Sequence, residues 1–264
     1  MGKRSGKMTV AKEGVIGWII FDNAARLNAM NMAMLREIPD IIADFDSDDS
    51  IRVIVVRGGG EKAFSAGADI SEFEEKRSSK EAVEAFDALD EGAERSVADA
   101  RKPTVAMING YCIGGGASFA LCCDLRIAAE NARFGVPAAR LGLGYDYAGI
   151  KRLLDAVGPM ATKEIFYTAR QYTAEEALAM GLVRSVLPLA EIEGYVRELA
   201  ETIGRNAPLT LRAVKTNVNE ALKGEQERDM ALCRQVVDDC FASQDYIEGR
   251  RAFMEKRSPN FQGR

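Results

Sequence analysis

The chain has 264 residues, of which 47% are hydrophobic and 28% charged, and its net charge is −5. This composition is that of a globular protein long enough for one large domain, and it excludes a mainly disordered chain. The acidic balance argues against a nucleic-acid partner, because binding to a phosphate backbone needs a basic face. The apolar runs are far shorter than the roughly 20 residues of a membrane span, so we expect no membrane partner.

Short apolar segments alternate with helical patterns in the first part of the chain. The segments rich in β-forming residues are 15–21, 51–57, 104–108 and 125–128. Between them, apolar residues recur at helical spacing in 31–46 and 80–100. Strands that alternate with helices predict an α/β fold.

The pattern becomes entirely helical after about residue 190. Helical spacing of apolar residues indicates helices in 192–203, 211–222, 225–241 and 245–257. No long linker or low-complexity segment separates the two parts. We therefore expect an α/β core over residues 1–190 and a helical C-terminal region over residues 191–264.

The chain contains no histidine, which excludes Ser-His-Asp and Cys-His catalysis and the common histidine metal sites. Its five cysteines have spacings that fit no zinc site. They are Cys112, Cys122, Cys123, Cys233 and Cys240. We interpret them as small buried residues of a reduced protein, and we expect no metal. Segment 1–10 is basic but lacks the apolar stretch of a secretory signal, so we expect a cytoplasmic protein.

Two glycine-rich segments carry the strongest chemical signal. Segment 63–70 reads AFSAGADI, and segment 109–118 reads NGYCIGGGAS and opens an apolar helix. A run of glycines at a helix start leaves free N–H groups that a ligand can approach closely, and the helix dipole favours negative charge there. The alternative is a tight strand-to-helix turn without a ligand. The run does not fit a dinucleotide-binding site, because no acidic residue follows on a second strand at the required interval.

The order of motifs resembles that of the crotonase, or enoyl-CoA hydratase/isomerase, superfamily. The resemblance covers nearly the whole chain. Besides the two glycine-rich segments, it rests on RLNAM at 26–30, CDLRIA at 123–128, ARFGVPAARLGL at 132–143, TAEEALAMGLV at 173–183 and EGRRAFMEKRSPNF at 248–261.

This resemblance implies a spiral of ββα units, a helical trimerisation layer and a homotrimer or hexamer. It also implies a coenzyme A thioester as substrate, with no separate cofactor. The shared device of the family is an oxyanion hole for the thioester carbonyl, which the resemblance assigns to the backbone N–H groups of Ala68 and Gly115. Two fixed donors of this kind stabilise an enolate.

Two positions depart from the pattern of the family's hydratases. Where those proteins carry a pair of glutamates, this chain has Ser118 and Ala138. Alanine cannot carry a proton and a serine without a base is weak, so hydration by a glutamate pair is in doubt. We interpret Ser118 as a residue that packs or caps the helix start.

Tyr145 and Asp146 are the candidate replacements. Tyr145 resembles a tyrosine of the methylmalonyl-CoA decarboxylase-like branch, which also has an apolar residue at the Ala138 position. Asp146 resembles an aspartate of dienoyl-CoA isomerases. The alternative interpretations are that Tyr145 packs beside the site and that Asp146 caps a helix beginning near Ala148.

The resemblance also implies a set of coenzyme A contacts. Residues from three parts of the chain contribute, and a neighbouring subunit lends the last two. The residues are Arg26, Leu27, Ala29, Ala66, Asp69, Ile70, Phe253 and Lys256. An ordinary solvated helix surface is the alternative for Lys256.

The main functional prediction is an enolate reaction such as decarboxylation, since it depends least on the missing glutamates; Tyr145 then orients the leaving carboxylate. An enoyl-CoA isomerase or atypical hydratase that uses Asp146 as acid and base is the first alternative. The second is a scaffold that binds acyl-CoA or RNA without catalysis.

Overall fold

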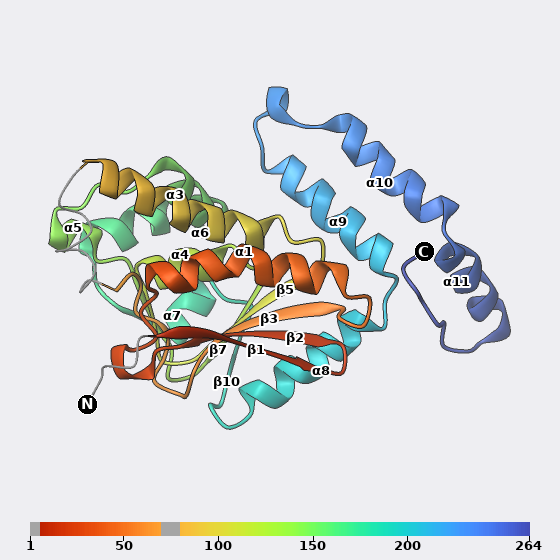
Figure 1. Ribbon diagram of the computed structural model, residues 1–264, viewed down its shortest axis with the longest axis horizontal. Coiled ribbons are helices and arrows are strands. Elements are labelled where there is room, and N and C mark those ends of the chain that lie inside the picture. The colour runs from red at the N-terminus through yellow and green to blue at the C-terminus, as the bar shows by residue number, and fades with distance from the viewer. Residues whose placement is uncertain (1–5, 70–79) are drawn as a thin grey trace.

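The computed structural model describes residues 6–69 and 80–264, which form two sheets surrounded by helices (Figure 1). The larger sheet has six strands in the order β1-β2-β3-β5-β7-β10. Strand β1 is antiparallel to β2, and the remaining pairs are parallel. The strands are β1 (Lys7–Glu13), β2 (Ile16–Asp22), β3 (Val53–Gly58), β5 (Thr104–Ile108), β7 (Leu125–Ala129) and β10 (Ser185–Leu187).

The smaller sheet supplies the second strand of each repeated ββα unit. Its strands are β4 (Ala63–Ser65), β6 (Tyr111–Ile113), β8 (Arg133–Gly135) and β9 (Tyr172–Thr173). Each of the parallel strands β4, β6 and β8 comes directly after a strand of the larger sheet, and a helix comes next in the described chain. These helices are α3 (Lys80–Ala98), α4 (Gly115–Leu121) and α5 (Ala138–Leu141). The predicted α/β spiral of ββα units is confirmed.

Helices cover both faces of the larger sheet. Successive residues of its central strands therefore point into apolar clusters on opposite sides. In β3, Ile54 and Val56 pack into the cluster that includes α1 (Met32–Ser47) and α3. Val53 and Val55 face the opposite way, into a cluster with α8 (Ile192–Gly204). This two-sided burial gives the glycine-rich segments a rigid support.

The strands and helices predicted in the first part of the chain are present. The four apolar runs correspond to β2, β3, β5 and β7, and the two helical patterns correspond to α1 and α3. Asn31 caps helix α1, since its side chain accepts from the N–H of Met34. Two further helices, α6 (Tyr147–Thr168) and α7 (Ala174–Ala179), connect β8 to β9 and β9 to β10.

The C-terminal helices beyond α8 extend away from the sheets, as Figure 1 shows at its right. They are α9 (Pro208–Ala221), α10 (Met230–Ala242) and α11 (Gln244–Glu255). Helix α10 begins five residues later than the pattern predicts, because Asp229 accepts from the N–H of Leu232 and caps the helix there. Helix α8 packs on the sheet; the division near residue 190 and the trimerisation role remain predictions.

In the two described stretches of the chain, no helix is long and apolar enough to cross a membrane.

Candidate functional site

The two glycine-rich segments meet at one edge of the smaller sheet. Strands β4 and β6 are parallel neighbours, so the residues that follow them leave the sheet on the same side. Residues Gly67 and Ala68 follow β4, and Gly115 follows β6 as the first residue of α4. A Cβ atom placed on Gly115 would lie 3.6 Å from the backbone nitrogen of Ala68. The structure therefore brings together the two amides that the sequence assigns to an oxyanion hole.

Both amides are available to a ligand. Ala68 forms a parallel bridge with Met30, in which the hydrogen bonds run from Met30 N–H to Gly67 O and from Asp69 N–H to Met30 O, each 2.8 Å. The N–H of Ala68 itself takes no part in this bridge. Gly115 begins α4, where N–H groups have no partner within the helix. Neither amide donates to another residue in the part of the chain that the structure describes. We call Ala68 N–H and Gly115 N–H the amide pair.

The glycines beside the amide pair are required by geometry. Gly67 has φ of +95°, a conformation that other residues rarely adopt. A Cβ atom on Gly116 would lie 2.3 Å from the carbonyl oxygen of Ser65, so a side chain there would push α4 away from β4. The glycines thus allow the close approach of α4 to β4 that sets the spacing of the amide pair.

The two positions that lack glutamates are buried. Ser118 lies one turn into α4, and Ala138 is the first residue of α5. The hydroxyl of Ser118 forms a hydrogen bond with the hydroxyl of Tyr145. Ser118 therefore has a specific polar partner and does more than pack the helix start, which extends the interpretation made from the sequence.

Tyr145 is fixed by its ring as well as by its hydroxyl. The ring packs edge to face on Phe166, with centroids 4.9 Å apart. Burial raises the pKa of Tyr145 to about 12, so the phenol remains protonated at neutral pH. A small cavity of about 20 Å³ lies between Tyr145, Ser118 and the apolar residues around them, which we call the Tyr145 cavity. Its other lining residues are Ala117, Leu121, Phe134, Gly135, Val136, Gly149, Leu153, Ile165, Phe166, Tyr172 and Leu182.

Asp146 occupies the capping position of α6. Its carboxylate accepts from the N–H of Gly149 at 2.6 Å, and the residue is exposed to solvent. The capping interpretation is therefore confirmed. A second role as acid and base stays a prediction; the cap bond engages one of the two carboxylate oxygens.

Five of the predicted coenzyme A contacts lie together. The backbone N–H of Ala66 donates to the carbonyl of Leu27 at 2.9 Å, and the guanidinium of Arg26 lies 2.5 Å from the carboxylate of Asp69. The segments around 26 and 66 therefore form one wall beside the amide pair. Ala29 is buried in the same turn. Ile70 lies outside the described residues.

Phe253 and Lys256 lie far from the rest of the predicted contacts. Figure 1 shows α11 at the opposite end of the molecule from α5. Phe253 is 82% exposed, and Lys256 ends α11 in a left-handed conformation. A single chain does not bring these residues to the amide pair. Their predicted contribution through a neighbouring subunit remains a prediction.

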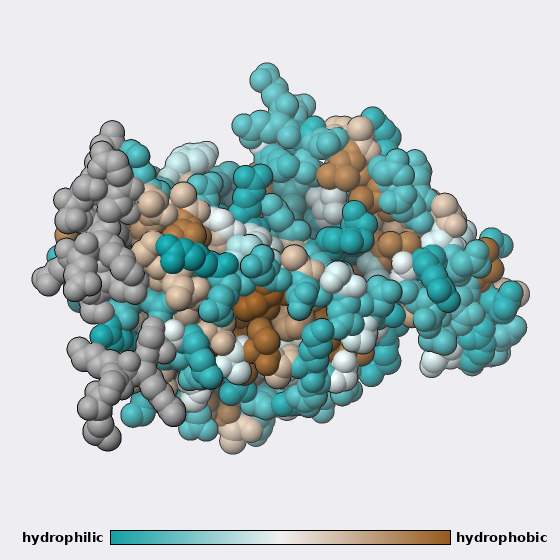
Figure 2. Space-filling view, in the orientation of Figure 1, coloured by the Kyte–Doolittle hydropathy of each residue, from teal (hydrophilic) through white to brown (hydrophobic). Residues whose placement is uncertain are grey.

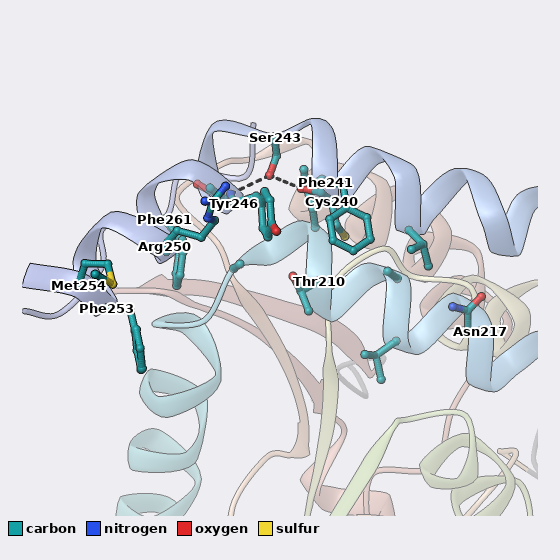
Figure 3. A pocket seen from close by; sticks show the side chains of 17 residues that line it. Thr210, Asn217, Cys240, Phe241, Ser243, Tyr246, Arg250, Phe253, Met254 and Phe261 are labelled. Carbon is teal, nitrogen blue, oxygen red and sulfur yellow. Dashed lines mark hydrogen bonds between the residues drawn. The ribbon is translucent and has the colours of Figure 1, made fainter. Parts of the chain in front are cut away.

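A large cavity also lies in the C-terminal region. It holds about 800 Å³ between α9, α10 and α11 (Figure 3). Apolar side chains such as Phe241, Phe253 and Phe261 line it, while Ser243 is occupied in capping α11. The cavity has little polar lining and is far from the amide pair, so its size does not mark the reactive site.

One buried charged residue was missed in the sequence. Glu94 of α3 is 7% exposed and forms an ion pair with Arg152 of α6. Burial raises the pKa of Glu94 to about 7, and the nearby carboxylate of Asp90 adds to this effect. Glu94 lies beside the apolar stripe of α3 that contains Ala93 and Val97. The only sign of its burial in the sequence is an acidic residue next to this stripe.

Comparison with solved structures defines the class of the fold. The chain is similar to a putative enoyl-CoA hydratase/isomerase family protein from Hyphomonas neptunium, with a TM-score of 0.92 and 34% identity, covering 97% of this chain and 98% of the other. Two mixed sheets with C-terminal helices are thus the crotonase fold.

Comparison of sequences then gives the family. Residues 11–264 match the model described as enoyl-CoA hydratase/isomerase. The chain is 37% identical to a crotonyl-CoA hydratase of Syntrophomonas wolfei over 95% of both proteins. It is 34% identical to a short-chain-enoyl-CoA hydratase of Clostridium acetobutylicum, over 93% of this chain and 94% of the relative. The chain therefore belongs to the enoyl-CoA hydratase/isomerase family.

These relatives correct one expectation. The residues around Tyr145 suggested a branch similar to methylmalonyl-CoA decarboxylase, whereas the curated relatives are named hydratases. The comparisons therefore favour the alternative reading, which includes an atypical hydratase, over the main prediction of decarboxylation.

Proposed function

We propose that the protein binds a short-chain enoyl-CoA thioester and adds water to its double bond, or catalyses the reverse dehydration. The amide pair is the observation that carries this proposal, because hydration of an enoyl thioester passes through an enolate. Two donors at Ala68 and Gly115 match the negative charge that develops on the thioester oxygen. Support also comes from the hydratase names of the relatives.

In this reaction the oxygen of water bonds to the β-carbon while the electrons of the double bond move to the thioester oxygen. The amide pair donates to that oxygen. A proton lost from the attacking water is balanced by a proton delivered to the α-carbon when the enolate collapses. The amides are held by the backbone before substrate arrives, and each contributes roughly 3 kcal/mol to lowering the barrier.

Asp146 is the proposed acid and base. With Ser118 and Ala138 at the usual glutamate positions, it is the carboxylate directly next to Tyr145. Its cap bond to Gly149 fixes the carboxylate in space. The hydrogen-bonded hydroxyls of Ser118 and Tyr145 are proposed to orient the attacking water. Proton transfer by such a positioned group contributes roughly 10²–10⁴-fold.

The size of the acyl group follows from the Tyr145 cavity. Its free volume is only about 20 Å³, and bulky side chains line most of it. We therefore favour a short acyl chain. The wall formed by Arg26, Leu27, Ala29, Ala66 and Asp69 is the proposed contact for the coenzyme.

The test is turnover of crotonyl-CoA in water enriched in ¹⁸O, followed by mass spectrometry. A hydratase gives 3-hydroxybutyryl-CoA that carries one ¹⁸O atom. Methylmalonyl-CoA and a dienoyl-CoA are offered in parallel reactions. Carbon dioxide release from methylmalonyl-CoA, with crotonyl-CoA unchanged, would replace the proposed hydration by decarboxylation. Isomerisation of the dienoyl-CoA alone would replace it by an isomerase, and binding without turnover would favour a scaffold.

Decarboxylation stays the second candidate because of one observation. The side chains at 118 and 138 offer no carboxylate that would repel a carboxylate on the substrate. The protonated Tyr145 hydroxyl can donate to that group.

A further inference from the structure

Glu94 is a buried charged residue that the proposed reaction does not use. Its side chain is 10% exposed, and its carboxylate is bonded to the guanidinium of Arg152, which is 24% exposed. Taking a carboxylate out of water costs free energy that a solvated ion pair would avoid. A pair placed in this way joins α3 to α6 at one fixed position. Figure 1 shows the two helices on the same side of the larger sheet.

Helix α6, to which Glu94 is paired through Arg152, is also the helix that follows Tyr145. Tyr145 and Asp146 directly precede α6, and Gly149 and Leu153 on its first two turns line the Tyr145 cavity. Arg152 adjoins Leu153 in sequence, so a movement of the ion pair moves the wall of the cavity. The pair is thus mechanically connected to the Ser118–Tyr145 hydrogen bond.

The connection is also electrostatic. The groups that interact with Glu94 are Asp90 on its own helix and Arg152 and Asp146 at the start of α6. Cys122 at the end of α4 and the hydroxyl of Tyr145 both respond to the Glu94 charge. Burial is the main cause of the raised pKa of Tyr145, and an ionised Glu94 raises it further and so weakens the hydroxyl as a donor. A protonated Glu94 removes that effect.

We propose that Glu94 is a positioning residue of the reactive site: through Arg152 it fixes the start of α6, and its charge modulates how strongly the Tyr145 hydroxyl donates. This inference rests on the proposed function, since it concerns the same site. It adds to the proposed reaction a dependence on pH that comes from Glu94. The ionisation of Glu94 falls near neutral pH, where a small change of pH alters its charge.

The first test does not need turnover. 3-Fluorotyrosine is introduced at position 145, and its ¹⁹F signal is followed from pH 5 to pH 9. We expect a titration centred near pH 7 in the otherwise unchanged protein and its loss in Glu94→Gln, which keeps hydrogen bonding to Arg152 but cannot ionise. Glu220→Gln is the matched control, because Glu220 of α9 is also buried and forms an ion pair with Lys223, just beyond the end of that helix. Its loss should leave the titration unchanged.

A second variant keeps the test decisive where Glu94→Gln folds poorly. Arg152→Gln removes the cation that favours ionised Glu94, so the midpoint should move above pH 7. A titration that persists in Glu94→Gln, or none near pH 7 in the parent protein, would overturn the proposal.

The second test uses turnover of the enoyl-CoA. We expect kcat to fall roughly 10-fold as pH rises through 7, the change expected for an electrostatic effect of one pKa unit. The fall should disappear in Glu94→Gln, with KM little changed. A pH profile identical in the parent protein and the variant would show a purely structural role. No turnover with any enoyl-CoA would count against the proposed function instead, while the ¹⁹F titration still decides the coupling of Glu94 to Tyr145.

Discussion

A single backbone N–H group is the smallest unit on which the proposed chemistry depends. Gly115 occupies the first position of α4, where proline is well tolerated by a helix. Gly115→Pro therefore deletes the donor with limited damage to the helix. We expect kcat for the enoyl-CoA to fall roughly 10²–10³-fold, the usual cost of losing one oxyanion donor. Thermal melting and binding of coenzyme A serve as controls for folding; an unchanged kcat would remove Gly115 from the site.

Glu94 has a consequence for stability that can be measured without substrate. Its pKa in the folded protein is about 7, above the ordinary value of 4.5, so the folded state holds this proton more tightly than the unfolded chain. The Glu94 contribution to stability is therefore fully present below about pH 4.5 and is lost as pH rises toward 7. The slope is at most roughly 1.4 kcal/mol per pH unit.

Urea unfolding of the parent protein and Glu94→Gln at several pH values measures this contribution. The free-energy advantage of the parent protein over the variant should decline between about pH 4.5 and pH 7. Two unfolding curves that stay parallel across this range would show that Glu94 keeps the same charge throughout.

At the residue scale, the sequence indicated which backbone segments would meet. The SAGAD and GGG segments lie side by side in the structure, since glycine at 67 and 116 is needed for the close approach of β4 and α4. The role of the amide pair as an oxyanion hole stays a prediction from the family resemblance. The hydrogen bond between Ser118 and Tyr145 was not predicted, since it joins residues 27 positions apart in the chain. Glu94 was missed because its burial depends on α6, which meets α3 only in the folded protein.

At the scale of the element, the start of α6 combines a structural and a proposed chemical role in Asp146. Asparagine caps helices about as well as aspartate but is not a base, whereas alanine does neither. Asp146→Asn should lower kcat roughly 10²–10⁴-fold with little effect on the melting temperature. Asp146→Ala should lower kcat similarly and also cost about 1 kcal/mol of stability.

The comparison of these two variants separates the roles. Tyr145→Phe is measured beside them, because a decarboxylase would be harmed more by loss of this hydroxyl than by Asp146→Asn. Near-parent kcat/KM in Asp146→Asn would leave Asp146 as a cap alone.

The helices and strands that could be predicted from the sequence are those long enough to show a repeating pattern of apolar residues. Helix α1 and strands β3 and β5 are buried over their whole length on one or both faces, so their apolar patterns are clear. The strands of the smaller sheet have only two or three residues each. No periodicity exists over such a length, and these strands are defined by their pairing with one another.

At the scale of the whole molecule, the C-terminal helices expose apolar surface that a monomer does not cover. Figure 2 shows apolar side chains gathered over these helices. Val214 and Val218 on α9, and Leu222 at its C-terminal cap, are 50–57% exposed, and Phe241 on α10 is 61% exposed. Such surface favours association with further copies of the chain. Sedimentation equilibrium should give the mass of three or six chains, and a monomer at micromolar concentration would contradict this prediction.

A neighbouring subunit should then supply Phe253 and Lys256 to each site. Co-expression of a Gly115→Pro chain with a Phe253→Ala, Lys256→Ala chain tests this directly. Each homo-oligomer is expected to be nearly inactive, because each lacks one half of every site. Mixed oligomers should regain activity, because some interfaces join an intact amide pair to an intact α11. If the mixed oligomers are no more active than the two variant homo-oligomers, the amide pair and α11 of the same chain would form each site.

The order of strands in the larger sheet has a consequence for how the chain folds as it leaves the ribosome. The spatial order of its strands, from β1 to β10, is also the order in which the ribosome makes them. Each new strand of this sheet can therefore pair with the edge strand that was made before it. No strand has to be inserted between two earlier ones. Strands β4 and β6 are also complete before α9 to α11 emerge. The amide pair can thus take its geometry on the nascent chain, and assembly with other copies waits for the last helices to be released.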